Sequence, residues 1–174
     1  MKNNPKNKPF FLTKLSVGDE IKFSGIIYTA RDQVHKRLVK DIGKGKVLPF
    51  DIKGAAIYYC GPAKAPKGKV IGSCGPTTSS RMDEFTPFLL KKGLKAMIGK
   101  GRRSKEVTEA IKKYKAVYFL APAGCGALVS KYIKEAKPVA YRDLGPEQIL
   151  RLKVENLPLV VGIDSRGRSI YGKD

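Results

Sequence analysis

A glycine-rich turn that joins an apolar run to a helical pattern is the sequence feature that most constrains the fold. Residues 69–71 form the apolar run, and the turn is centred on Gly75-Pro76. Apolar residues then recur at helical spacing at Met82, Phe85 and Leu89. Gly93 is placed to end that helix, and residues 77–79 (Thr, Thr, Ser) are all good N-caps. The pattern predicts a strand over 69–71, a tight turn, and a helix that starts near 77–79.

A helix that starts at this turn would favour an anion. Its first backbone N–H groups point outward, and the positive end of the helix dipole lies there. Arg81 falls in or near the first turn, where its charge opposes the dipole. That placement is reasonable if a carboxylate binds at the same place. An ordinary capped helix with a solvated arginine is the other interpretation, and the residues alone leave both open.

The charge of the chain limits its partners. The formal net charge is +20, from 35 Lys and Arg against 15 Asp and Glu. Such an excess indicates nucleic acid, an anionic substrate or an acidic partner subunit. Lysine is also abundant in proteins from hot environments, so the composition favours a thermophile as well.

Length and hydropathy predict one globular domain. The chain has 174 residues, of which 42% are hydrophobic, enough for a real core. No apolar run approaches the ~20 residues of a membrane span, and residues 1–9 lack the apolar stretch of a secretory signal. We therefore expect a cytoplasmic protein with no membrane contact. Residues 1–11 should form a flexible basic tail, and residues 12–174 the domain.

Three cysteines are present, each followed by glycine: Cys60, Cys74 and Cys125. The odd count without close spacing argues against a disulfide framework, and no zinc-type Cys/His pattern occurs. Three thiolates can hold an iron–sulfur cluster, but small cysteines at strand ends beside tight turns are the simpler interpretation. We expect this chain alone to bind no metal and no cofactor.

Strands and helices alternate through the middle of the chain, while strand-like segments dominate both ends. Strands are expected at 20–24, 26–28, 55–59, 94–98, 116–121, 138–141, 149–154 and 158–163, and helices after Thr29, at 104–114 and at 127–133. Thr29 and Asp32 have the spacing of a capping box. His35, the sole histidine, either pairs with Asp32 or a backbone group or acts as a general acid or base. The alternation predicts an α/β domain with a mixed sheet covered by helices and extra β-structure on the other side.

Four motifs follow one another along the chain: Thr29-Ala30-Arg31-Asp32 with His35, Tyr59-Cys60-Gly61-Pro62, Gly75-Pro76-Thr77-Thr78 with Arg81-Met82-Asp83, and Gly99-Lys100-Gly101. Together, in order and spacing, they resemble the C-terminal region of the class I, iron–sulfur fumarases. In many organisms this region is a separate chain, the beta subunit of fumarate hydratase or of L-tartrate dehydratase. The resemblance covers residues 12–171.

The resemblance implies a fold and a reaction. The fold is the swivelling β/β/α domain, an α/β arrangement of three layers with a mixed sheet. The reaction is that of a hydro-lyase, the reversible hydration of fumarate to L-malate in the tricarboxylic acid cycle, or alternatively the dehydration of L-tartrate. The enzyme would be active only with an alpha subunit, whose own cysteines hold a 4Fe-4S cluster, and would assemble into a higher oligomer.

The resemblance also assigns substrate-binding residues. Arg31 and Arg81 match carboxylate-binding arginines, a role that suits the planar fork of a guanidinium. Thr78 and Lys100 match further positions that contact the dicarboxylate substrate.

Thr77 matches the catalytic threonine that takes the proton from the substrate carbon. A threonine hydroxyl is a poor base unless the site is strongly cationic and dehydrated. Asp32, His35 and Gly75 match site positions and are candidates for supporting roles that the sequence leaves unassigned.

A basic nucleic-acid-binding domain is the alternative from another class, because charge alone favours it. The lysines are spread along the chain, however, and no recognised motif interleaves aromatics with them. The resemblance therefore argues against nucleic acid as the partner. A self-sufficient small-acid enzyme that uses its own three cysteines is a further alternative.

Overall fold

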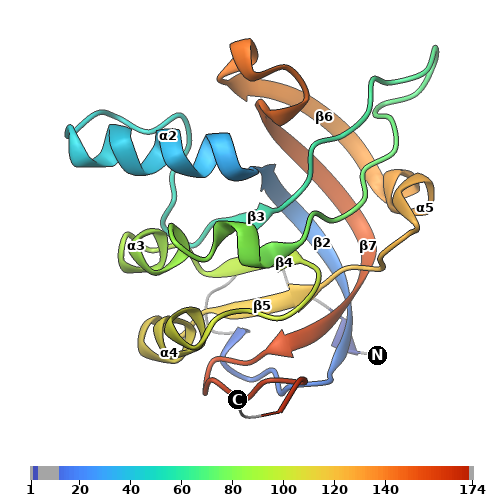
Figure 1. Ribbon diagram of the computed structural model, residues 1–174. Helices are drawn as coiled ribbons and strands as arrows, with labels where there is room; N and C mark the ends of the chain where they lie inside the picture. Colours follow the sequence, from blue (N-terminus) through green and yellow to red (C-terminus); the bar gives the residue numbers. More distant parts are fainter. Residues whose placement is uncertain (1, 4–11, 173–174) are drawn as a thin grey trace.

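A strongly curved mixed sheet forms the centre of the molecule. The computed structural model describes residues 2–3 and 12–172 (Figure 1). The strands are β1 (Lys2–Asn3), β2 (Glu20–Thr29), β3 (Ala56–Tyr58), β4 (Ala96–Gly99), β5 (Val117–Leu120), β6 (Ile133–Ala140) and β7 (Ile149–Ile163). β2, β3, β4 and β5 are parallel neighbours, and β7 runs antiparallel to β2, β5 and β6. Because β7 pairs with both β5 and β2, it closes the sheet on itself.

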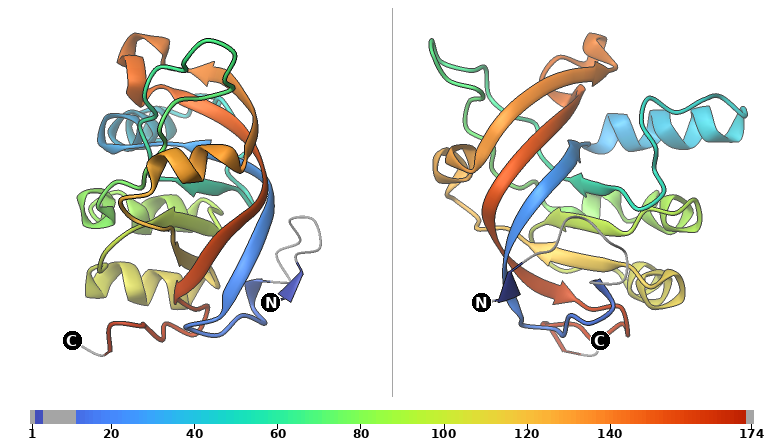
Figure 2. Two further views of the ribbon diagram at one scale, coloured as in Figure 1. Left: turned by 90° about the vertical axis from the view of Figure 1, so that its right-hand side faces the viewer. Right: turned by 180° about the vertical axis from the view of Figure 1, so that it is seen from behind.

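The described helices lie between the strands along the chain, and three of them cover one side of β3–β5 (Figure 1). They are α2 (Asp32–Gly43), η1 (Ser79–Met82), α3 (Thr86–Lys91), α4 (Lys105–Tyr114), α5 (Gly126–Lys131) and η2 (Arg142–Glu147). α2, α3 and α4 lie together on the side of β3–β5 that is opposite the long ribbons of β2, β6 and β7 (Figures 1 and 2). α2 and α4 each turn one apolar stripe inward.

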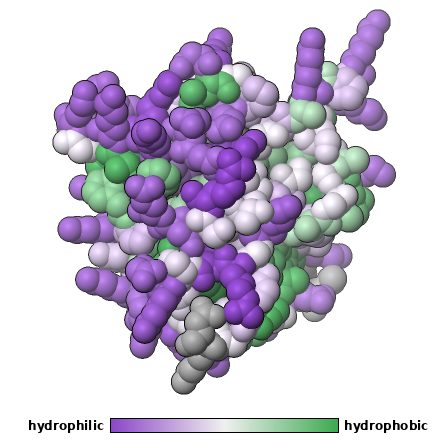
Figure 3. Space-filling view, in the orientation of Figure 1, coloured by the Kyte–Doolittle hydropathy of each residue, from purple (hydrophilic) through white to green (hydrophobic). Residues whose placement is uncertain are grey.

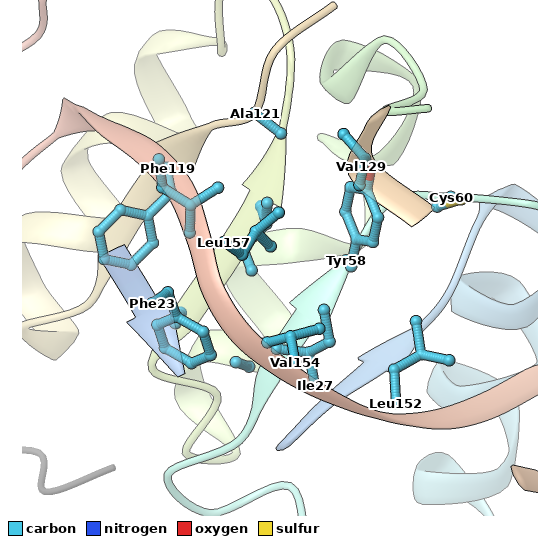
Figure 4. Packing of buried hydrophobic residues seen from close by; sticks show 14 of the residues in the cluster. Phe23, Ile27, Tyr58, Cys60, Phe119, Ala121, Val129, Leu152, Val154 and Leu157 are labelled. Carbon is cyan, nitrogen blue, oxygen red and sulfur yellow. The ribbon is translucent and has the colours of Figure 1, made fainter. Parts of the chain in front are cut away.

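Two hydrophobic cores separate three layers. One core lies between β3–β5 and the curved ribbon of β2, β6 and β7, and includes Phe23, Tyr58, Phe119 and Leu152 (Figure 4). The other lies between β3–β5 and the helices, and includes Leu38, Met97 and Ile111. The order is therefore β-layer, β-layer, helices. The predicted α/β fold with a mixed sheet in a three-layer arrangement is confirmed.

The predicted strand over 69–71 is wrong. Residues 61–77 contain no strand or helix, and Val70 is half exposed. Ala63 N–H donates to the Ser73 carbonyl at 2.9 Å, so the segment folds back on itself instead of joining the sheet. An apolar run becomes a strand only where a neighbouring strand is free to pair with it.

The helix predicted to start at 77–79 does begin there, with Thr78 at its N-cap position, but as a short 3₁₀ turn and not as an α-helix. The turn leads into η1, a single 3₁₀ turn without a side-chain cap, and α3 begins later, at Thr86. Pro87 is accommodated in the first turn of α3, where a missing N–H costs nothing. Since no α-helix begins at this turn, the helix-dipole argument for an anion beside Arg81 does not hold.

Thr29 and Asp32 do not form the expected capping box. Arg31 occupies the N-cap of α2 and makes no side-chain cap. The Thr29 hydroxyl donates to the Gln148 carbonyl and accepts from Leu150 N–H, at 3.0 and 2.9 Å. Thr29 therefore joins β2 to the start of β7 instead of capping the helix.

Several boundaries at the two ends differ from expectation. The segments 20–24 and 26–28 are one strand, and 149–154 and 158–163 are one strand with a bulge. Glu155 and Asn156 of β7 together face the single residue Ser24 of β2, so the bulge lies in β7, where Asn156 has a φ of 55°. Of the predicted tail, Lys2–Asn3 pair with β2, and Met1 and residues 4–11 lie outside the described residues.

Candidate functional site

The candidate residues lie at one edge of the sheet, where three neighbouring parallel strands end. Arg31 follows β2, Tyr59 follows β3, and Lys100 follows β4. Ligands of open parallel sheets bind at this carboxyl edge, because the loops there are free to face one another. The topology therefore gathers residues that are far apart in the sequence.

The Arg31 side chain packs against the turn that follows β3. A side chain at Gly61 would bring a Cβ within 3.1 Å of Arg31 Cδ and Nη1, so glycine gives the guanidinium its room. Arg31 Nη2 stands 3.5 Å from Glu147 Oε1, and the side chain is about a quarter exposed. Arg31 Nε is buried without a partner. The exposed part of the Arg31 side chain thus remains available for a ligand.

Asp32 and Arg81 form an ion pair between α2 and η1. The carboxylate accepts from Arg81 Nη2, although the two residues are 49 positions apart. The Arg81 side chain is half exposed, and Asp32 Oδ1 is buried without a partner. This contact gives Asp32, which the sequence left unassigned, a clear function: it orients Arg81.

His35 is fully buried under the same helix start. Its Nδ1 is 2.9 Å from the Arg31 carbonyl, which only accepts, so Nδ1 carries the proton. Burial is the main reason why the pKa of His35 falls from 6.5 to about 4. The ring packs edge-on against Tyr59, with centroids 5.3 Å apart. His35 therefore holds the backbone of Arg31 as a neutral ring, which agrees with the expected backbone partner.

Thr77, Thr78 and Lys100 are positioned by backbone contacts. Thr77 N–H donates to the Tyr59 carbonyl at 2.6 Å, and Thr78 forms an isolated parallel bridge with Lys100. Within residues 2–3 and 12–172, neither the Thr77 hydroxyl nor the Lys100 ammonium has a protein partner. Both groups are thus available to a ligand.

Hydrogen bonds from Ser79 and Tyr118 hold the Thr78–Lys100 contact in place. Ser79 Oγ accepts from Lys100 N–H at 3.0 Å and from the Tyr118 hydroxyl at 2.9 Å. Ser79 N–H donates to the Lys100 carbonyl at 3.0 Å. A Cβ at Gly99 would collide with Ser79 and stand 2.8 Å from the Tyr59 ring, so this packing requires glycine there.

Gly75 lies against a different loop. Gly75 packs closely against Gly126 at the start of α5. The neighbouring Cys74 N–H donates to the Gly126 carbonyl at 3.0 Å. Gly75 therefore fixes the path of the turn rather than contacting the cations, and its predicted supporting function remains a prediction.

Arg103 and Asp83 form a buried pair that sequence reasoning missed. Arg103 Nε donates to Asp83 Oδ1 at 2.6 Å, and its Nη2 donates to the Thr86 hydroxyl at 2.8 Å. The other Asp83 oxygen accepts from Ser104 N–H at 2.6 Å. The pair ties η1 and α3 to the start of α4. The sequence signal for this pair is weak, because Asp83 belongs to one of the four motifs but Arg103 belongs to none.

The chemistry of this edge suits a small dianion. Two guanidiniums, one ammonium and two threonine hydroxyls lie around the end of β3, and hydrophilic residues cover most of the face that Figure 3 shows. A guanidinium binds both oxygens of a carboxylate, so two of them match a dicarboxylate. Within the described residues, no group of three or more His, Cys, Asp or Glu could hold a metal ion.

The fold and the site thus define a three-layer α/β domain with a cationic carboxyl edge. The chain belongs to the Fumarase C-terminus family, whose model matches residues 3–174. The family resemblance read from the four motifs is confirmed.

Curated relatives are of two lengths. The chain is 40% identical over 164 residues to a Methanocaldococcus jannaschii protein provisionally named L(+)-tartrate dehydratase subunit beta, which covers 91% of this chain and 84% of that protein. It is 34% identical over 168 residues to the L(+)-tartrate dehydratase subunit beta of Escherichia coli, with 94% and 82% covered. It is 38% identical over 162 residues to the anaerobic class I fumarate hydratase of Escherichia coli, covering 92% of this chain but 30% of that protein.

Proposed function

We propose that this chain is the beta subunit of an iron–sulfur-dependent hydro-lyase that interconverts fumarate and L-malate. The observation that carries the proposal is the convergence of Arg31, Arg81, Lys100 and Thr77 at one edge of the sheet. The family and the names of its members support the reaction class.

The two arginines bind the two substrate carboxylates in this proposal. Arg81 is held by Asp32 through one Nη atom, which leaves its remaining N–H groups for the ligand. Arg31 has an unpartnered Nε and a weak, 3.5 Å contact to Glu147. Thr78 and Lys100 add a hydroxyl donor and a cation on the other side of the Tyr59 turn.

Thr77 moves the proton. Dehydration of L-malate takes a proton from one carbon and hydroxide from the next, and the Thr77 oxygen accepts that proton. Lys100 and the two arginines stabilise the negative charge that Thr77 needs in order to act as a base, most strongly when water is excluded. The return of the proton from Thr77 to fumarate is the hydration direction.

The alpha subunit supplies the other wall of the site. A 4Fe-4S cluster bound there provides a Lewis acid for the departing hydroxyl. The cluster ligands belong to the alpha subunit in this proposal, because the described residues of this chain offer no suitable set. We further propose that the complex is a higher oligomer in the cytoplasm. No described helix is long and apolar enough to cross a membrane.

L-Tartrate is the second candidate substrate. The specific observation in its favour is length: the chain covers 84% and 82% of two relatives that are named as tartrate dehydratase beta subunits. The reaction class and the proposed residue functions are the same for both substrates.

Reconstitution tests the proposal. The chain should be assayed anaerobically alone and with its alpha subunit, against fumarate, L-malate and L-tartrate. We expect turnover only in the complex, with fumarate and L-malate the better pair. Substantial turnover by the isolated chain would refute the two-subunit proposal, and a preference for L-tartrate would select the second candidate. Steep, salt-dependent binding of duplex DNA would favour the nucleic-acid alternative instead.

A further inference from the structure

Two Cys-Gly-Pro turns lie side by side at the end of β3. Cys60-Gly61-Pro62 directly follows the strand, and Cys74-Gly75-Pro76 leads into Thr77. The Tyr58 hydroxyl donates to the Cys74 carbonyl at 2.6 Å, which fixes the second turn against the first. The two Sγ atoms are 2.7 Å apart, and both residues are buried.

We propose that Cys60 and Cys74 are a cross-linking site that becomes a disulfide when the chain meets a low-molecular-weight disulfide. The thiolate of one cysteine attacks a sulfur of the small disulfide and releases one small thiol. The second cysteine then attacks the mixed disulfide and releases the other. The protein loses two hydrogen atoms, and the small disulfide is reduced to two thiols.

Geometry and burial support this pairing. Because the side chains already face each other in contact, the bond requires little movement of the backbone. Hydrogen bonding to Cys74, followed by burial, raises the pKa of the Cys60 thiol, so little thiolate exists in the folded chain. Exchange should therefore occur while the chain folds or when this segment opens. Cys125 is exposed and is not part of the pair.

The cross-link would fasten the two turns on which the candidate site is built. Arg31 lies against Gly61 in the first turn, and Thr77 follows the second. Residues 61–73, between the two cysteines, contain no helix or strand. A Cys60–Cys74 disulfide would therefore join the two ends of a loop that no secondary structure stabilises. This inference does not depend on the proposed activity.

Oxidative refolding tests the inference on the full chain. The protein is unfolded and reduced, then refolded with oxidised glutathione, and its remaining thiols are blocked before trypsin digestion. Lys64 and Lys69 allow trypsin to separate the two cysteines, so the bond would join peptide 54–64 to peptide 70–81. We expect that linked pair by mass spectrometry, and its loss on reduction. Three free thiols, or a link to Cys125, would overturn the proposal.

Variants test where the bond lies and what it does. Cys125→Ala should keep the linked peptides, and Cys60→Ala and Cys74→Ala should each abolish them. The oxidised chain should melt roughly 5–10 °C above the reduced chain, because closing a loop of this length restricts the unfolded state. Cys60→Ala should show no such difference between oxidising and reducing conditions. A linked chain with an unchanged Tm would refute the fastening of the folded turns.

Discussion

Replacement of Asp83 by asparagine removes the carboxylate that balances a buried guanidinium. The Arg103 side chain has no exposed surface, and Asp83 accepts from its Nε at 2.6 Å. Removing one partner of a buried ion pair costs about 3–5 kcal/mol, because the other charge is left uncompensated. We expect the free energy of unfolding to fall by about that amount and the Tm to fall by roughly 6–20 °C.

Urea unfolding followed by circular dichroism measures this loss. Arg103→Met in the Asp83→Asn background should restore part of the stability, because it removes the uncompensated charge and fills the space. Asp143→Asn is the matched control, since Asp143 pairs with Arg37 at the surface, where water screens the charges. A loss for Asp83→Asn no larger than that for Asp143→Asn, or no recovery in the double variant, would refute the reasoning.

Three further predictions concern the candidate site. Arg81→Lys keeps the charge but loses the fork, so kcat/KM of the reconstituted complex should fall markedly; a near-native value would make Arg81 a solvated residue. Thr77→Val should lower kcat by about 10²–10⁴-fold with a smaller change in KM, while Thr77→Ser retains much of the activity; an active valine variant would remove Thr77 from catalysis. As the pH falls below 6.5, His35 takes up a proton in the unfolded chain, but in the folded chain it does so only near pH 4 because its pKa is low. The contribution of neutral His35 to the free energy of unfolding is therefore complete above pH 6.5 and is lost as the pH falls toward 4. Relative to His35→Asn, the free energy of unfolding of the wild type, measured by urea titration, should fall by roughly 3 kcal/mol between pH 7 and 4. Parallel dependences of this free energy on pH in the two proteins would contradict the prediction.

Local patterns in the sequence determined the elements whose interactions are themselves local. A helix begins at Ser104 as predicted, where the Ser104 hydroxyl accepts from Val107 N–H, and the buried face of α4 follows the apolar spacing. The alternation of strands and helices sufficed for the layered α/β class, because each parallel strand needs a crossover that covers the sheet. The four motifs were enough to identify the family, since their residues and spacing are visible without coordinates.

The tertiary structure alone decided how distant residues meet. Nothing local indicates that Asp32 pairs with Arg81, that Asp83 balances Arg103, or that Cys60 faces Cys74. The same limitation explains why the apolar run at 69–71 is no strand, since a strand depends on a partner elsewhere in the chain. Capping and periodicity act over a few residues. Pairing across the carboxyl edge depends on the closure of the sheet by β7, which brings together segments that no short window of sequence contains.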